Sequence, residues 1–184
     1  MIDSSCHLPW KWLVVDAPRN KWRWCCKVNW QFDFKSEFND KNLLLNQVKK
    51  EFINGQRPKA CNVCWKEEDA GSASYRTLQA RIDGVTTIDQ LPPSAGLKFI
   101  DLIYGNLCNL RCASCNDLSS SQWASLLHQH PTKEYYWLNN KKSSYGLDFL
   151  SDKLLSVIEE NLLSLTHINL YGGEPSRSEE HTSE

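Results

Sequence analysis

LKFIDLIYGNLCNLRCASC, residues 97–115, is the stretch of sequence that decides the fold. Residues 97–104 form a mostly apolar run of strand type, with Asp101 inside it. A continuous apolar run of this length is typical of a strand that is covered on both faces, as in a parallel sheet. We therefore predict a strand over 97–104, followed directly by a loop that carries three cysteines.

The chain behind this loop alternates helix and strand. We expect a short helix over 119–128 and a polar, aromatic loop over 130–145. A longer amphipathic helix is expected over 147–163, and a second short strand over 167–171. The order strand, helix, strand predicts a right-handed parallel unit, which is the building block of an α/β barrel or a doubly wound sheet.

Cys108, Cys112 and Cys115 have the spacing C-x3-C-x2-C in this loop. Three thiolates on a tight loop can bind three irons of a 4Fe-4S cluster and leave the fourth iron without a protein ligand. Loops at the carboxyl ends of parallel strands are also where α/β folds place their chemistry. A closed zinc site, completed by a histidine or a fourth cysteine, is the alternative interpretation.

The sequence LYGGEP, residues 170–175, ends the second expected strand. Together with the cysteine loop it resembles the signature of the radical S-adenosylmethionine superfamily, whose GGEP motif follows the second barrel strand. The resemblance implies that the three cysteines bind three irons, while the fourth iron chelates the methionine moiety of S-adenosylmethionine. Glycines let a backbone approach a ligand closely. The cofactor-binding residues implied are Gly172, Gly173, Glu174 and Pro175.

The part of the chain before residue 94 is predicted to be a hairpin followed by helices. The tryptophans of the hairpin are expected to cover a small core from one face. A linker rich in Pro, Ser and Gly ends this part. The expected elements are strands over 10–15 and 21–28 with a turn over 16–20, helices over 41–54 and 66–81, and a linker over 92–96.

Five of the eight cysteines lie in this N-terminal part: Cys6, Cys25, Cys26, Cys61 and Cys64. The hairpin and the C-x2-C knuckle are expected to bring their thiols to one end of a small domain that is too poor in core to be stable alone. In a reducing compartment such groups of cysteines indicate metal ligation more than disulfides.

These cysteines, with the residues after the knuckle, resemble the cysteine-rich segment of radical enzymes of the twitch and SPASM type. In those enzymes the segment binds an auxiliary iron-sulfur cluster. Zinc in a closed site is the alternative here too. The ligands that the resemblance implies are Cys6, Cys25 or Cys26, Cys61 and Cys64.

The predicted fold class is α/β, with a cysteine-rich hairpin-plus-helix segment before the first β/α units of a truncated, partial (β/α)6 TIM-like barrel. We assign residues 1–93 to the auxiliary cluster-binding segment and residues 94–176 to the start of the barrel. Residues 177–184 resemble the translation of a sequencing adapter and are expected to be a non-native tail. The chain is therefore expected to be a C-terminally truncated fragment that is inactive alone.

Composition limits the partners and the location. A net charge of -1 disfavours a nucleic-acid protein held mainly by phosphate contacts. No run approaches the ~20 apolar residues that a membrane span needs. The first residues lack the charged and apolar regions of a signal peptide, so a cytoplasmic protein is expected.

The function implied by both resemblances is reductive cleavage of S-adenosylmethionine to a 5′-deoxyadenosyl radical, which abstracts hydrogen from a substrate. An electron donor such as flavodoxin or ferredoxin is implied as partner. A peptide or protein is the favoured substrate class, by family analogy alone, and nucleosides or small metabolites stay open. The alternative is a non-catalytic zinc-binding module that uses the Trp-rich hairpin as an interaction surface.

Overall fold

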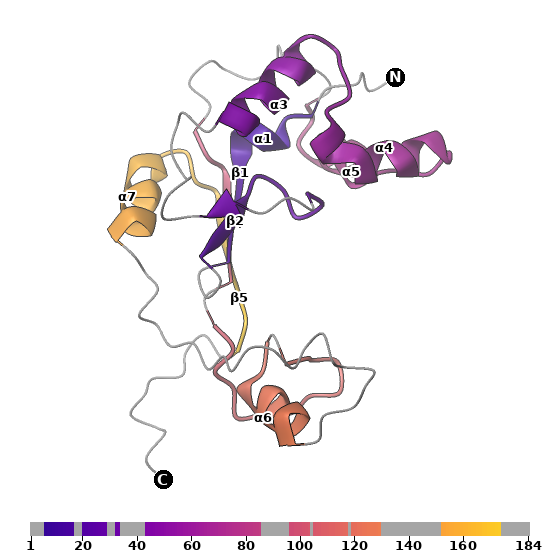
Figure 1. Ribbon diagram of the computed structural model, residues 1–184. Coiled ribbons are helices and arrows are strands. Elements are labelled where there is room, and N and C mark those ends of the chain that lie inside the picture. Colours follow the sequence, from indigo (N-terminus) through magenta and orange to yellow (C-terminus); the bar gives the residue numbers. More distant parts are fainter. Residues whose placement is uncertain are drawn as a thin grey trace.

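The computed structural model describes residues 6–16, 20–28, 32–33, 43–85, 96–103, 105–117, 119–129 and 152–173. These residues form a mixed α/β structure built around a five-stranded sheet (Figure 1). The predicted mixed α/β class is confirmed, whereas the barrel stays a prediction. The expected loop over 130–145, most of the linker over 92–96, and the tail over 177–184 lie outside the described residues.

The sheet has the strand order β3-β2-β1-β4-β5. Neighbours β1, β4 and β5 are parallel, while β2 is antiparallel to both β1 and β3. The predicted parallel pairing of the strand before the cysteine loop with the strand before the glycine pair is confirmed. The strands are β1 (Trp12–Asp16), β2 (Lys21–Arg23), β3 (Phe32–Asp33), β4 (Phe99–Ile103) and β5 (His167–Tyr171).

Strand β1 connects the two segments that the sequence analysis divided at residue 93, because it belongs to the first segment and pairs with a strand of the second. It pairs in parallel with β4, with Leu13 opposite Ile100. All five residues of β1 are buried, as suits a strand inside a sheet. Three parallel strands are therefore present among the described residues, β1, β4 and β5, where the sequence pattern predicted two.

Two predictions about the hairpin were wrong in their bounds. Trp10 lies in the short helix α1 (Leu8–Lys11), because Pro9 at the start of that helix favours helical backbone. Strand β2 ends at Arg23, because the chain then turns: the Val28 N–H donates to the Cys25 carbonyl oxygen, at 3.2 Å. The cysteine pair at 25 and 26 is thus held by a turn.

The helices follow the predicted order. Gly55, with φ of 69°, follows the first long helix, as expected for a residue that ends a helix. The helix predicted over 66–81 is two helices, because Gly71 has φ of 79° and Ser74 caps a new start by accepting from the Thr77 N–H. The longer helices are α3 (Leu43–Ile53), α4 (Asn62–Asp69), α5 (Tyr75–Ile82), α6 (Ser121–Gln129) and α7 (Asp152–Asn161), and the 3-10 helix η1 spans Lys59–Cys61.

The core lies between the sheet and the helices at the upper end of Figure 1. It includes Leu13 and Val15 of β1 with Leu154 and Val157 of α7. Helix α6 lies at the other end of the sheet, beyond the carboxyl end of β5 (Figure 1). Among the described residues, no helix combines the length and the apolar character that a membrane crossing requires.

Candidate functional site

The cysteine loop begins where β4 ends. Cys108 is buried, Cys115 is half-buried and Cys112 is exposed. Because β4 and β5 are parallel neighbours, the loops that follow them leave the same edge of the sheet. The loop therefore lies where the sequence analysis expected it.

Hydrogen bonds close the loop on the start of α6. The Ser121 hydroxyl accepts from the Cys108 N–H at 3.1 Å and donates to the Cys108 carbonyl oxygen at 3.0 Å. The Ser121 N–H donates to the Asn106 carbonyl oxygen, and the Asn106 amide donates to the Asp117 carbonyl oxygen. Ser121 and Asn106 thus fix the backbone at the first cysteine, a role that the sequence analysis missed.

The other two cysteines share one turn. The Cys115 N–H donates to the Cys112 carbonyl oxygen at 3.0 Å, and the Trp123 indole N–H of α6 donates to the same oxygen at 3.0 Å. At the first cysteine, the Leu110 N–H donates to the Cys108 sulfur at 3.4 Å. Such a donor reduces the charge that a thiolate must carry.

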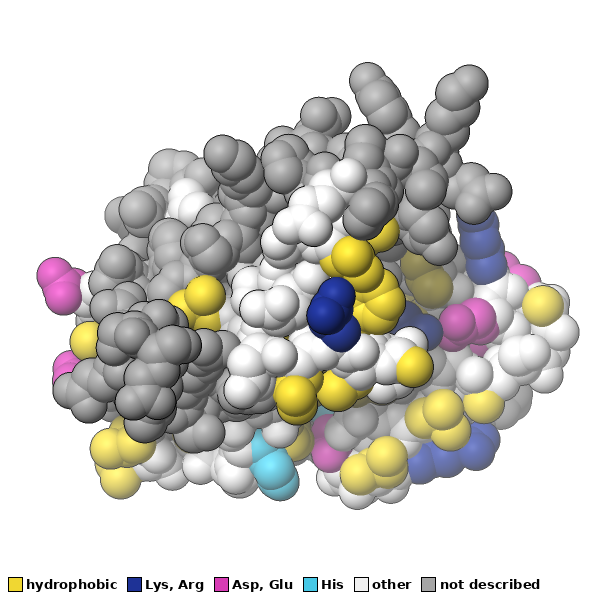
Figure 2. Space-filling view, turned by 90° about the horizontal axis from the view of Figure 1, so that it is seen from below, with side chains coloured by type: hydrophobic (Ala, Val, Ile, Leu, Met, Phe, Trp, Pro, Cys, Tyr) yellow, Lys and Arg dark blue, Asp and Glu magenta, His cyan; other side chains and the backbone are white. Residues whose placement is uncertain are grey.

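The face that carries this loop is shown in Figure 2, which views the molecule from below. Hydrophobic side chains gather around one basic side chain near its centre, and the acidic side chains lie toward its margins. Among the loop residues, Leu110, Arg111 and Cys112 are exposed. The loop is therefore accessible from this side.

The glycine pair after β5 packs directly against the cysteine loop. Gly172 has φ of 101°, and a Cβ built on it would overlap the Gly105 carbonyl oxygen. A Cβ on Gly173 would overlap the Leu107 carbonyl oxygen. Glycine is therefore required here by the backbone of the loop itself. Glu174 and Pro175, the other residues of the motif, lie outside the described residues.

Polar residues line one face of the sheet just before these loops. Residues paired across parallel strands share a face, so Asp101 and Asn169 lie side by side. The Asn169 amide donates to the Asp101 carboxylate at 2.8 Å. The Asp101 that interrupts the apolar run is thus a buried, paired carboxylate.

Of the N-terminal cysteines, Cys61 ends η1 and Cys64 lies in α4, and Figure 1 shows α4 and α5 at the end of the molecule opposite α6. Four of the five N-terminal cysteines, from three segments of the chain, line one pocket. Cys26 alone of the five lies outside its lining. The pocket is lined by Cys6, Leu8, Pro9, Trp24, Cys25, Lys27, Val28, Phe52, Cys61, Cys64 and Arg76.

Burial keeps these thiols protonated. It raises the pKa of Cys61 to about 12 and raises the pKa of Cys6 still further, and it also raises the pKa of Cys64. Electrostatic interaction with Cys61 and Cys64 adds to the rise at Cys6. A metal reverses this preference, because it binds the thiolate form.

The adjacent cysteines of the turn have different environments. The hydrogen bond between the two thiols, with burial second, raises the pKa of Cys25, and the same hydrogen bond lowers the pKa of Cys26. Cys26 also faces Tyr75, Arg23 and Asp101. The sequence left Cys25 and Cys26 open as candidates. The structure places Cys25 in the pocket that Cys6, Cys61 and Cys64 also line, which we call the thiol pocket.

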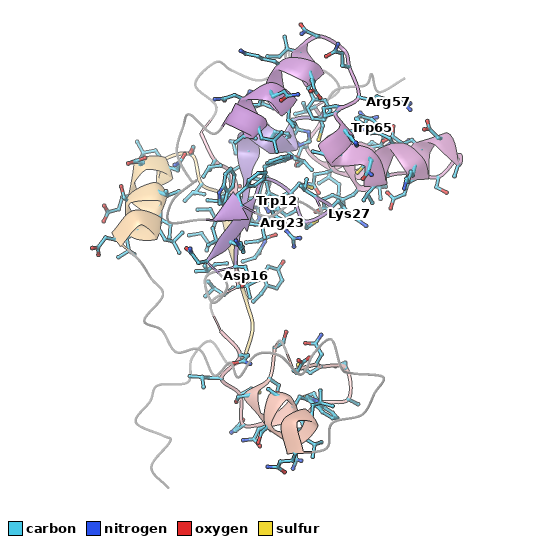
Figure 3. The ribbon with its side chains drawn as sticks, viewed as in Figure 1. Trp12, Asp16, Arg23, Lys27, Arg57 and Trp65 are labelled. Carbon is cyan, nitrogen blue, oxygen red and sulfur yellow. The ribbon has the colours of Figure 1, made fainter. Side chains whose placement is uncertain are left out.

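Paired side chains brace this end of the molecule. The buried His7 contacts Asp83 through Nε2 and Oδ2 at 2.5 Å. The Trp65 indole N–H donates to the Pro58 carbonyl oxygen at 3.1 Å. The Arg57 guanidinium lies 5.1 Å from the Trp65 ring centre, and both side chains are labelled in Figure 3.

Neither group of cysteines surrounds a single point. Among the described residues, no three His, Cys, Asp or Glu side chains are grouped closely enough to hold one metal ion. No family model matches the sequence, and no curated protein or solved structure matches it either. The arguments for function therefore rest on the geometry of these two groups and on the sequence motifs.

Proposed function

We propose that this chain is part of a radical S-adenosylmethionine enzyme. In this proposal Cys108, Cys112 and Cys115 bind the 4Fe-4S cluster, and the turn that begins with Gly172 and Gly173 binds the cofactor. Such a cluster supplies the electron that splits S-adenosylmethionine into methionine and a 5′-deoxyadenosyl radical. The contact between the cysteine loop and the glycine turn is the observation that carries the proposal.

This contact matters because the two motifs are 57 residues apart, from Cys115 to Gly172. An isolated glycine pair is most often an ordinary turn. Here the Gly173 N–H donates to the carbonyl oxygen of Ser119, at 3.0 Å, and Ser119 follows the last of the three cysteines by four residues in the chain. A ligand held by the open iron of a cluster on this loop would meet the backbone of the glycine turn.

The exposed position of Cys112 suits this use. A cluster that reacts with a bound ligand needs one side open, unlike a closed structural site. Cys112 is exposed while Cys108 is buried, so the loop anchors one thiol and presents another. Closed zinc ligation would require a fourth ligand near these three sulfurs.

We further propose that β4 and β5 are the first two strands of a partial (β/α)6 barrel. Their parallel pairing, with α6 and α7 in the chain between them, is the repeating unit of that fold. Among the described residues β5 is an edge strand of the sheet, and all five of its residues are exposed, so a further strand would pair along this edge.

The thiol pocket is proposed to hold an auxiliary iron-sulfur cluster through Cys6, Cys25, Cys61 and Cys64. A zinc ion needs four sulfurs about 2.3 Å from one point. A cubane has its irons at separate corners, so it takes thiols that are further apart. The proposal of a cluster is supported by four cysteines that line one pocket, three of them buried (Cys6, Cys25 and Cys64) and Cys61 half-buried.

The proposed partners follow from this chemistry. A flavodoxin or ferredoxin would deliver the electron, and the exposed face around Arg111 in the cysteine loop is accessible to such a donor. A peptide or protein is the proposed substrate class, by analogy with radical enzymes that carry an auxiliary cluster.

Anaerobic purification of the full chain tests the proposal. We expect iron and acid-labile sulfide, with broad visible absorption that air removes. A variant with Cys108, Cys112 and Cys115 replaced by serine should lose one pool of iron, and a variant with the four pocket cysteines replaced should lose the other. Added S-adenosylmethionine should change the electron paramagnetic resonance spectrum of the second variant only.

A colourless protein with stoichiometric zinc would contradict the proposal. That result would support the alternative, a zinc-binding interaction module in which both cysteine groups are structural. Iron that persists when the three loop cysteines are replaced, with an unchanged response to S-adenosylmethionine, would show that the site assignment is wrong.

A further inference from the structure

A buried arginine lies at the thiol pocket. Arg76 is only 3% exposed and lies in the first turn of α5. Its guanidinium donates to both carboxylate oxygens of Glu68, at 3.0 and 2.6 Å. It also lies over the Trp65 ring, 4.7 Å from the ring centre. Few arginines are so completely withdrawn from water, because burial of a charge is costly unless the charge is compensated.

Arg76 is directed toward the sulfurs as well as toward Glu68. It lines the pocket, and its backbone N–H forms a hydrogen bond with the Cys64 sulfur. Its charge lowers the pKa of Cys6 and of Cys61, against the larger effect of burial. Arg76 therefore supplies a hydrogen bond to Cys64 and a positive charge that acts on Cys6 and Cys61.

Among the described residues that line the pocket, Lys27 is the other basic one, and its charge is not buried. Lys27 lines the pocket but is 42% exposed, and its ammonium lies 3.8 Å from Glu67. Figure 3 shows Lys27 away from Trp65, on the side of β2. The acidic groups oppose thiolate formation, since Glu51 raises the pKa of Cys61, and Glu67 with Glu68 raises that of Cys64.

Metal binding makes this charge important. Four thiols that bind a metal release their protons, and the thiolates bring more negative charge into the pocket than a divalent metal neutralises. A buried cation beside them offsets the excess in a region where water cannot. We propose that Arg76 is a positioning residue of the auxiliary site, where its guanidinium compensates the charge of the four thiolates. This proposal rests on the auxiliary site proposed above.

The alternative is that Arg76 only braces α4 against α5. Both roles predict that loss of Arg76 weakens metal binding. A variant in which Glu68 is neutralised distinguishes them. In the charge role, neutralising Glu68 leaves Arg76 over Trp65 with more of its charge available to the sulfurs. In the brace role, neutralising Glu68 is harmful, because the bidentate ion pair is broken.

The test uses the full chain with Cys108, Cys112 and Cys115 replaced by serine, so that only the thiol pocket takes up iron and sulfide. Arg76→Gln, Arg76→Lys and Glu68→Gln are compared in this background. The readouts are the chelator concentration that removes half of the iron and the midpoint potential. Circular dichroism of the metal-free proteins reports whether each variant folds.

We expect Arg76→Gln to lower the half-removal concentration about tenfold, which corresponds to about 1.4 kcal/mol. Its midpoint potential should fall, because the reduced cluster carries more negative charge. Arg76→Lys should remain within about threefold of the background, since it keeps the charge. Glu68→Gln should hold iron at least as well as the background, and its midpoint potential should rise.

Equal iron retention and potential in Arg76→Gln and the background would overturn the proposal. So would a loss in Glu68→Gln as large as that in Arg76→Gln. If Arg76→Gln does not fold, the signs of the Glu68→Gln changes decide. A background protein that takes up no iron would instead overturn the auxiliary cluster itself, and with it the role given to Arg76.

Discussion

The backbone N–H of Gly173 donates a hydrogen bond to the carbonyl oxygen of Ser119 at 3.0 Å. Through this bond the turn after β5 is joined to the segment between the cysteine loop and α6. The two motifs that define the candidate site are therefore one structural unit at the carboxyl edge of the sheet. A substitution in the turn should therefore also destabilise the cysteine loop.

Gly172→Ala is expected to destabilise the chain. Its φ of 101° disfavours any side chain, and a Cβ would overlap the Gly105 carbonyl oxygen. Gly71→Ala is the matched control, since Gly71 also has a positive φ, 79°, but nothing within 4 Å of the added atom. Urea unfolding should show a loss about 2 kcal/mol larger for Gly172→Ala. Equal losses would mean that the close approach to the loop is wrong.

Ser121→Ala is expected to loosen the loop at its first cysteine. The hydroxyl of Ser121 bonds both the N–H and the carbonyl oxygen of Cys108, at 3.1 and 3.0 Å. Its loss should cost about 1 kcal/mol and speed the release of loop iron to a chelator. Ser125→Ala on the same helix is the control, because the Ser125 hydroxyl accepts only a long, exposed contact from Gln129 at 3.5 Å. The idea fails if both variants release iron at the same rate.

Cys25→Ala and Cys26→Ala should separate the adjacent cysteines. Cys25 lines the thiol pocket, whereas Cys26 faces Tyr75 and Asp101. We expect Cys25→Ala to lose the metal of the pocket and Cys26→Ala to retain it, as measured by elemental analysis of the purified chains. Metal loss from Cys26→Ala alone would reverse the assignment, and loss from both would show that the pair acts together.

The metal-free chain is expected to lose stability at alkaline pH. Burial raises the pKa of Cys61 from its usual 9.0 to about 12. The folded thiol therefore stays protonated while the unfolded thiol ionises, so stability is full below pH 9 and falls as the pH rises toward 12. The slope is about 1.4 kcal/mol per pH unit for one such thiol.

Urea midpoints at several pH values, measured with chelator present, check this expectation. Cys61→Ala should show a shallower decline in stability with pH than the parent chain, because it lacks this thiol. Some decline should remain, since lysines and other groups titrate in both chains. Bound metal should abolish the Cys61 contribution, since it holds the thiolate in the folded state. A parent chain and a Cys61→Ala chain with the same pH profile would refute the buried, protonated thiol.

Local features of the chain were predictable because they depend on neighbouring residues. The apolar run of β4 and the periodicity of α3 are properties of a few consecutive side chains, and Gly55 ends its helix by its own backbone preference. The position of the three-cysteine loop followed in the same way, since it comes directly after a strand that could be recognised.

The failures have a common origin in contacts between distant segments. Nothing in the pattern of β1 specifies that it pairs with β4, because a buried strand has the same composition whatever its neighbour. Gly71 divides one predicted helix into two, and Ser74 then caps the second by a bond that a periodicity count does not include.

Sequence by itself therefore determined the strand, the cysteine loop and the glycine motif, each from residues that are adjacent in the chain. Only the tertiary structure decided that the glycines pack on the loop, that Cys25 and not Cys26 lies in the thiol pocket, and that Arg76 lies beside that pocket. The physical reason is that a side chain's partners across the fold depend on the packing of whole elements, which spacing along the chain does not encode.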